Sequence, residues 1–319
     1  MLLTVLLPYI LLLHTVHSFD HNDCYTTGGE YTMCAYMKQY AKNYLHKQDF
    51  ELKKKNILSR MTHNTHSTDL VKFGLNSGSD KTFHANVHLQ RSRPDTRPDT
   101  DKHVLRLSSN QLPDDLDLRD KMQPIKNQME CGSCYVFAAV SVLEYHAGVS
   151  LSEQKLMDCS SSDNGPSYGC DGGWPTTLFE YAMNQPIVSE SDQPYLGENQ
   201  ACNQTCGNSL SNIKTFGTID STKDPASETR IPYILNTHGP VVVAIDVGTT
   251  ELLMSYIDGI FPGIACGTEQ DHAVTIVGYT PEYWIIRNSW GVDWGDGGYF
   301  YLERGINACG VADSIGYII

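Results

Sequence analysis

The chain has 319 residues, of which 40% are hydrophobic and 19% charged, and its formal net charge at pH 7 is −14. A chain of this length can form one large domain or two smaller ones, each with its own hydrophobic core. The acidic balance argues against the concentrated basic surface of a nucleic-acid-binding protein, so no nucleic-acid partner is expected.

Residues 1–18 form a hydrophobic leader. They are mostly Leu, Val and Ile, contain no Lys or Arg, and end in Val16-His17-Ser18, where small residues occupy the two positions that signal peptidase recognises. The leader is too short to span a bilayer comfortably, so we interpret it as a cleaved secretory signal and not as a membrane anchor. We expect secretion or delivery to an acidic vesicle such as the lysosome, without membrane contact after cleavage.

The next part, residues 19–110, differs in charge from the rest. It contains 14 Lys and Arg and 10 Asp and Glu, whereas residues 111–319 contain 9 and 27, so the net charges are +4 and −18 and attract each other. Residues 19–62 are predicted to be helical, because apolar residues recur among Lys-rich positions without Pro or Gly from 31 to 62. Cys24 and Cys34 either pair or remain free.

Residues 90–110 are predicted to be an exposed linker. The tetrapeptide Arg93-Pro94-Asp95-Thr96 is repeated at 97–100, with two prolines and no apolar residue. Proteases cut such exposed polar segments easily. Because the linker lies at the boundary between the two charges, we interpret it as a processing junction.

Residues 111–319 have the composition of a packed domain with a helical half, about 120–212, and a sheet half, about 213–319. Helices are predicted over 134–147, ending at Gly148, over 152–159 with Ser152 as N-cap, and over 176–184. Strands are predicted over 241–247, 273–279, 283–287 and 299–302. The prediction is an α+β fold with a cleft between two subdomains.

The stretch Gln128-Met129-Glu130-Cys131-Gly132-Ser133-Cys134-Tyr135 leads into the first of these helices. A thiol near its ordinary pKa is mostly protonated at neutral pH, and a helix N-terminus or a cation is needed to activate it. Cys134 lies at the helix N-terminus, so we expect it to be a nucleophile. Cys131 is then a disulfide anchor, and Gln128 and the Cys134 N–H can donate to an oxyanion.

A base for this nucleophile must come from elsewhere in the chain. His146 lies at the far end of the same helix, His238 lies in a predicted turn, and His272 begins a strand 138 residues downstream of the cysteine. Asn288 ends the neighbouring strand and can orient the His272 imidazole. Trp290 can shield that hydrogen bond from water.

These residues resemble the papain-like, cathepsin-type cysteine proteases, whose local signature Cys-Gly-Ser-Cys is followed far downstream by His and Asn. The resemblance covers essentially all of 112–319 and includes further motifs in order. They are Leu151-Ser152-Glu153-Gln154, Gly169-Cys170-Asp171-Gly172-Gly173-Trp174-Pro175, Asp271-His272-Ala273-Val274 and Arg287-Asn288-Ser289-Trp290-Gly291.

The resemblance implies a helical subdomain, a second subdomain resembling an antiparallel β-barrel, and a helical propeptide in front of them. It further implies a cysteine endopeptidase, made as an inactive zymogen, that hydrolyses peptide bonds by a Cys–His thiolate–imidazolium mechanism through a thioester acyl-enzyme, without a cofactor or metal. Cys134 is then the nucleophile, His272 the acid and base, Asn288 the orienting residue and Gln128 the oxyanion donor. The partners are protein and peptide substrates and the chain's own propeptide, residues 19–110, as an intramolecular inhibitor; we expect a monomer.

The resemblance also assigns substrate contacts. Gly172 and Gly173 resemble the edge that hydrogen-bonds an extended substrate, because glycine allows close backbone approach. Asp271 and Trp290, beside the catalytic pair, are assigned to substrate binding as well. The second specificity pocket is uncharged, so we expect an apolar or aromatic substrate side chain there; its residues are Trp174, Pro175, Ala244, Ala273 and Ser314.

Disulfide pairs implied by the resemblance are Cys131–Cys170, Cys159–Cys202 and Cys266–Cys309. Cys206 is then either a free thiol or a competitor of Cys202, and Asn203 begins a glycosylation sequon, Asn-Gln-Thr. Tyr135 and Met129 depart from the Trp and Gly that are usual in the family, and we expect them to modulate the site.

Three other interpretations remain open at this point. Cys131 and Cys134 alone could form a thioredoxin-like redox pair, although the polar run 126–130 does not predict the strand that such a pair follows. Cys131, Cys134, Cys202 and Cys206 have spacings that a zinc site tolerates. A catalytically altered homologue could act as a binding protein without turnover.

Overall fold

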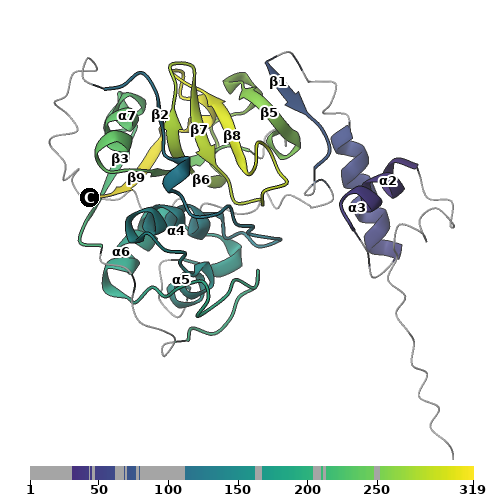
Figure 1. Ribbon diagram of the computed structural model, residues 1–319, viewed down its shortest axis with the longest axis horizontal. Helices are drawn as coiled ribbons and strands as arrows, with labels where there is room; N and C mark the ends of the chain where they lie inside the picture. Colours follow the sequence, from purple (N-terminus) through teal and green to yellow (C-terminus); the bar gives the residue numbers. More distant parts are fainter. Residues whose placement is uncertain are drawn as a thin grey trace, which may run out of the picture. The chain divides into compact units, whose positions relative to one another are not determined.

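The computed structural model describes residues 31–42, 44, 47–61, 68, 70–76, 79, 112–161, 167–203, 210, 213–247 and 252–319 (Figure 1). The chain divides into two compact units, residues 1–58 and 59–319. The predicted signal peptide, the linker 90–110, Cys24, the side chain of Cys34 and Cys206 lie outside the described part, so the alternatives for Cys24 and Cys34 stay open. Within the described part, no helix is long and apolar enough to cross a membrane.

The N-terminal part contains two helices, α2 (Tyr31–Gln39) and α3 (Lys47–Met61). The prediction that residues 19–62 are helical is confirmed for these two segments and wrong for the turn between them, while 19–30 lie outside the described residues. Ala41 has a φ of 51°, and the Lys42 N–H donates to the Met37 carbonyl at 2.9 Å, which is the hydrogen bond of a Schellman C-cap. Glycine or asparagine usually occupies this position, so the sequence, which has alanine there, does not indicate that the helix ends.

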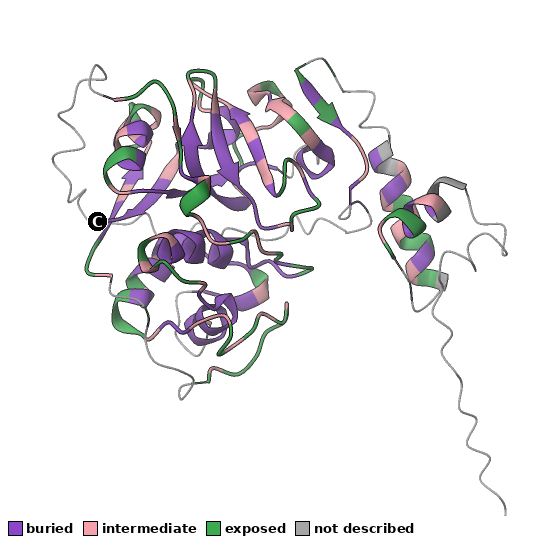
Figure 2. Cartoon of the chain, in the orientation of Figure 1, coloured by how far each residue is buried: buried purple, intermediate pink, exposed green. Residues whose placement is uncertain are grey.

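Three helices form the helical half of the second unit and confirm the predicted ones: α4 (Cys134–Ala147), α5 (Glu153–Ser160) and α6 (Pro175–Asn184). Helix α4 is buried along most of its length (Figure 2), and Gly148 with φ 71° ends it. The Ser152 hydroxyl accepts the Lys155 N–H at 2.9 Å, so it is the N-cap of α5. Short 3-10 helices are η3 (Arg119–Lys121), η4 (Gly169–Asp171), η5 (Leu252–Ser255), η6 (Gly263–Ala265) and η7 (Ala308–Gly310).

The sheet half contains one large sheet. Its order is β1-β5-β8-β7-β6-β4-β9-β3, and β2 pairs with β6. All pairs are antiparallel except β5 with β8, and among the described strands the sheet ends at β1 and β3 without closing into a barrel. The strands are β1 (Val71–Phe73), β2 (Leu116–Asp117), β3 (Phe216–Asp220), β4 (Val241–Ile245), β5 (Tyr256–Phe261), β6 (His272–Tyr279), β7 (Tyr283–Arg287), β8 (Tyr299–Glu303) and β9 (Ser314–Ile318).

The predicted strands correspond to β4, β6, β7 and β8, while β3, β5 and β9 were not predicted. Helix α7 (Ser227–Thr237) was also missed, because Pro232 lies inside it and proline normally argues against a helix interior. Ile231, Ile234 and Leu235 of α7 are nonetheless buried against the sheet core. Tertiary burial therefore outweighs the local cost of the proline.

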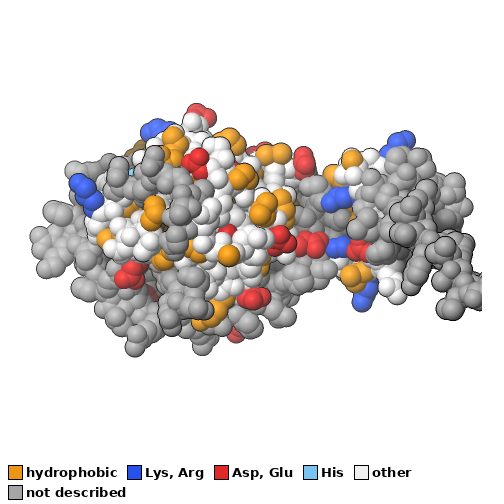
Figure 3. Space-filling view, turned by 90° about the horizontal axis from the view of Figure 1, so that it is seen from below, with side chains coloured by type: hydrophobic (Ala, Val, Ile, Leu, Met, Phe, Trp, Pro, Cys, Tyr) orange, Lys and Arg blue, Asp and Glu red, His pale blue; other side chains and the backbone are white. Residues whose placement is uncertain are grey.

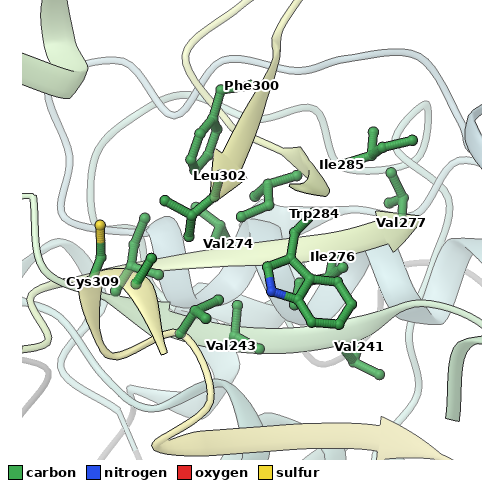
Figure 4. Packing of buried hydrophobic residues seen from close by; sticks show 14 of the residues in the cluster. Val241, Val243, Val274, Ile276, Val277, Trp284, Ile285, Phe300, Leu302 and Cys309 are labelled. Carbon is green, nitrogen blue, oxygen red and sulfur yellow. The ribbon is translucent and has the colours of Figure 1, made fainter. Parts of the chain in front are cut away.

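Strands β4 and β6 separate two hydrophobic cores. Val241 and Val243 belong to the core of the sheet half, together with Trp284 and Phe300 (Figure 4). Val242, the residue between the two valines, belongs to the other core, which contains α4 and α6. Alternate residues of a strand face opposite sides, so both faces of β4 are buried and the sheet lies directly against the helical half.

Part of the predicted propeptide belongs to this second unit. Strand β1 pairs antiparallel with β5 and extends the sheet edge, with Val71 opposite Gly259. The Asn76 side chain donates to the Met254 carbonyl at 2.8 Å. A Cβ on Gly259, whose φ is 92°, would lie 2.1 Å from the Leu70 carbonyl oxygen, so this strand pairing requires glycine.

On the side seen in Figure 3, hydrophobic side chains are scattered among polar and charged ones. Scattered exposed apolar residues are normal for a folded monomer. The expectation of a monomer therefore stays a prediction.

Candidate active site

Cys134 is the first residue of α4, and the loop in front of it is held from two directions. Cys131 forms a disulfide with Cys170, and the Gly132 N–H donates to the Cys170 carbonyl at 2.9 Å. The Gln128 N–H donates to the Ser289 carbonyl at 2.8 Å. Among the described cysteines Cys134 alone is free, so Cys131 and Cys134 do not form a redox pair with each other.

The Cys134 thiol lies close to the strand that carries His272. The sulfur shares a buried cluster with Ala273, the residue after His272, and the backbone amides of Ala273 and Tyr135 act to lower the pKa of the thiol. The side chain is only 1% exposed, and this burial raises the pKa of Cys134 to about 11 in spite of those donors. In the described state Cys134 is therefore a thiol at neutral pH.

His272 begins β6 and is oriented by Asn288. Its Nε2 lies 2.9 Å from Asn288 Oδ1, and its ring stacks on Trp290 with centroids 4.8 Å apart. Asn288 Oδ1 also accepts the Ser289 N–H at 2.8 Å, which identifies it as the carbonyl oxygen. Nε2 therefore carries the proton, and Nδ1 is left as the basic nitrogen. Burial lowers the pKa of His272 to about 4, although the Asn288 hydrogen bond acts in the opposite direction.

Gln128 is fixed by the elements around it. Its Nε2 donates to the Cys131 carbonyl at 3.0 Å, and its Oε1 accepts from the Ser289 hydroxyl at 2.6 Å. The Tyr195 hydroxyl donates to the Gln128 carbonyl at 2.9 Å. A primary amide has two N–H groups, so a second donor remains on Nε2. Neither of these contacts to Gln128 is predicted from the sequence. Ser289 lies inside the motif 287–291 without an assigned role, and nothing in the sequence singles out Tyr195.

The expected substrate-binding residues come from both halves. Gly172 and Gly173 follow η4, Trp174 is the residue before α6, and Pro175 is its first residue. Ala244 and Ala273 are opposite each other in the β4–β6 pair and share a core with Cys134, against which Trp174 packs.

Two expected binding residues have different surroundings. Ser314 begins β9 and lies opposite Asp220. The Asp271 carboxylate accepts the Val247 N–H at 2.8 Å, so it holds the chain that follows β4.

Among the described residues there are three disulfides, which are Cys131–Cys170, Cys159–Cys202 and Cys266–Cys309. Two of the four cysteines of the zinc alternative, Cys131 and Cys202, are thereby used. No cluster of three or more His, Cys, Asp or Glu side chains suited to a metal occurs in the described ranges. Asn203 of the sequon accepts a hydrogen bond from Lys155 Nζ through its carbonyl.

The known proteins to which this chain is similar, described next, are cysteine proteases or their precursors. The model of the papain family cysteine proteases matches residues 112–319. Pro-cathepsin H of Mus musculus is 33% identical over 306 residues, which cover 89% of each protein. Cysteine proteinase 3 of Solanum lycopersicum is 34% identical over 86% of this chain and 79% of its own. The structure of digestive procathepsin L 3 from Tenebrio molitor larval midgut has a TM-score of 0.75 at 28% identity, covering 90% of this chain and 97% of that one.

Proposed function

Since the chain belongs to the papain family of cysteine proteases and has its fold, we propose that it is an endopeptidase that cleaves internal peptide bonds through a thioester acyl-enzyme. The observation that carries the proposal is the junction between α4 and β6. There the free Cys134 thiol lies in one buried cluster with Ala273, the residue after His272, and His272 Nε2 lies 2.9 Å from Asn288 Oδ1.

Each residue of the site has its own role in the proposed hydrolysis of the peptide bond. Cys134 Sγ attacks the substrate carbonyl as its proton passes to His272 Nδ1, and the second Gln128 N–H and the Cys134 N–H stabilise the oxyanion. The imidazolium then protonates the leaving amine. Water, activated by His272 as base, hydrolyses the thioester and regenerates the thiol. Throughout, the Nε2–H hydrogen bond to Asn288 fixes the ring that moves the proton.

The experiment that tests this function uses peptides blocked at both termini. The processed protein should cut them at internal bonds, as shown by mass spectrometry, and iodoacetamide that alkylates Cys134 should stop the cutting. Cleavage only of peptides with a free terminus would replace the endopeptidase proposal by an exopeptidase. A lack of any cleavage by a folded protein that has intact disulfides and a free Cys134 thiol would favour a binding protein.

We further propose that residues 19–110 are an inhibitory propeptide, removed by cleavage in the linker 90–110 after entry into the secretory pathway. The pairing of β1 with β5 supports this, as do relatives that are themselves precursors by name. The glycan at Asn203 and the destination, a lysosome or the extracellular space, are part of the same proposal.

The pKa values of the pair lead to a prediction for the full-length chain. Burial raises the pKa of Cys134 to about 11 and lowers that of His272 to about 4, so both groups are neutral at pH 7. Between pH 6 and 9, the iodoacetamide alkylation rate of Cys134 should rise about ten-fold per pH unit, since only the thiolate reacts. The processed protein should lose this steep dependence and react faster at pH 6. Equal profiles before and after processing would contradict the prediction.

The specificity pocket gives a second prediction. Trp174, Pro175, Ala244, Ala273 and Ser314 carry no charge, so the substrate residue two positions before the cleaved bond should be apolar or aromatic. A peptide library randomised at that position measures this preference. A preference for arginine there would contradict the assignment of the pocket.

A further inference from the structure

Tyr135, the residue directly after the proposed nucleophile, contacts the backbone proposed to bind the substrate. Its side chain is 0% exposed. A Cβ placed on Gly173 would lie 2.5 Å from Tyr135 Cε2 and 2.8 Å from its Cδ2. The ring therefore packs directly against the Gly173 backbone, and a larger residue at 173 would displace it.

The hydroxyl of the same side chain reaches the start of this segment. It donates to the Gly169 carbonyl at 3.0 Å, and the Gly172 N–H donates to the same carbonyl at 3.3 Å. The Ser167 hydroxyl also interacts with it. Burial raises the pKa of Tyr135 well above its usual value, so the hydroxyl stays protonated and remains a donor.

We propose that Tyr135 is a positioning residue that sets the place of the Gly172–Gly173 edge relative to Cys134 and so determines how tightly extended peptides bind. This inference rests on the proposed function. Cys134 and Tyr135 are consecutive residues at the start of α4. A single rigid peptide unit therefore connects the proposed nucleophile to the residue that packs against the Gly172–Gly173 edge. The Cys131–Cys170 disulfide holds the other side of this segment.

The proposal separates two kinds of substrate. An extended peptide forms hydrogen bonds with the edge, whereas a small ester that offers little more than its reacting carbonyl does not need it. A shift of the edge should therefore weaken binding of the extended peptide and leave the reactivity of Cys134 unchanged. A merely structural defect would affect both.

The test is Tyr135→Phe in the processed enzyme, which keeps the ring and removes the donor to Gly169. The KM of a blocked tripeptide amide should rise roughly two- to ten-fold, because the peptide must then bind an edge that this buried hydrogen bond no longer holds in place. Its kcat, the KM of a blocked single-residue ester and the iodoacetamide alkylation rate should change less than about two-fold.

The matched control is Tyr279→Phe, which removes another buried hydroxyl that donates to a carbonyl, that of Pro113 at 2.9 Å. It should leave all four quantities unchanged. If Tyr135→Phe does not fold, Tyr135→Trp, which keeps an aromatic ring beside Gly173 but removes the hydroxyl that donates to the Gly169 carbonyl, should raise the tripeptide KM selectively.

An unchanged tripeptide KM in Tyr135→Phe overturns the role of Tyr135. The role is also overturned if tripeptide hydrolysis, ester hydrolysis and the rate of alkylation by iodoacetamide all fall by the same factor. A wild-type enzyme that hydrolyses neither substrate contradicts the proposed function instead. The two failures are therefore distinguishable.

Discussion

Replacement of Cys134 by alanine is expected to abolish peptide hydrolysis, with a fall in kcat/KM of at least about 10⁴-fold, because the attacking sulfur is lost. The fold should remain, since the Cys134 side chain takes part in no disulfide and alanine fits helix α4. Activity is measured with a blocked peptide amide, and folding by the thermal unfolding midpoint. Wild-type turnover by the folded variant would refute the nucleophile assignment.

A serine of the same helix provides the control for this variant. Ser141 is buried in α4, and its hydroxyl lies 2.6 Å from that of Thr275, outside the proposed chemistry. Ser141→Ala should retain most of the activity although it also removes one buried heteroatom. If Ser141→Ala and Cys134→Ala lost activity equally, damage to α4 would explain both results.

Replacement of Lys126 by methionine is expected to destabilise the fold by about 3–5 kcal/mol, the usual cost of leaving buried charges without their partner. Lys126 Nζ lies 2.7 Å from Glu144 and 2.8 Å from Glu153, whose side chains are only 1% and 2% exposed. It also donates to the Leu151 carbonyl at 2.7 Å. The free energy of unfolding in urea, measured in the Cys134→Ala background to prevent self-digestion, gives the difference.

The same variant should depend on pH in a defined direction. Burial raises the pKa of Glu153 well above its usual value, whereas the Lys126 cation acts to lower it. A carboxyl whose pKa is higher in the folded than in the unfolded state stabilises the fold less as the pH rises above about 4.3. Removal of Lys126 raises that folded pKa further, so the destabilisation should be larger at pH 7.5 than at pH 5.

Lys223 provides the matched control for Lys126. Its ammonium lies 3.9 Å from Asp220, and its side chain is 58% exposed. Exposed ion pairs contribute about 0–1 kcal/mol, so Lys223→Met should leave stability nearly unchanged. Equal losses for the two lysine variants would show that the burial of the Lys126 cluster does not matter in solution.

The sequence predicted the elements whose signals are local. Gly148 marks the end of α4, Ser152 caps α5, and β-branched residues mark β4. It could not predict α7, where Pro232 opposes the helix, or the turn at Ala41, which lacks the expected glycine. Strands β5 and β9 were missed because their place depends on partners far along the chain, which no local pattern specifies.

The same distinction applies to the site. Cys134, His272 and Asn288 could be proposed because their chemistry requires these residue types and the quoted motifs carry them. Tyr195 could not, because its role arises only when the chain brings its hydroxyl to the Gln128 carbonyl. The hydroxyl of Tyr135 is a similar case: the sequence shows the replacement of a Trp, and only the coordinates reveal its acceptor, Gly169.

Strand β6 is buried on both faces because its alternate residues serve different cores. Insertion of a single residue after Ala273 would reverse the side that every later residue of β6 faces, and Val274 and Ile276 would leave the core of the sheet half. This strand therefore cannot gain or lose one residue in its middle without exchanging its two buried faces.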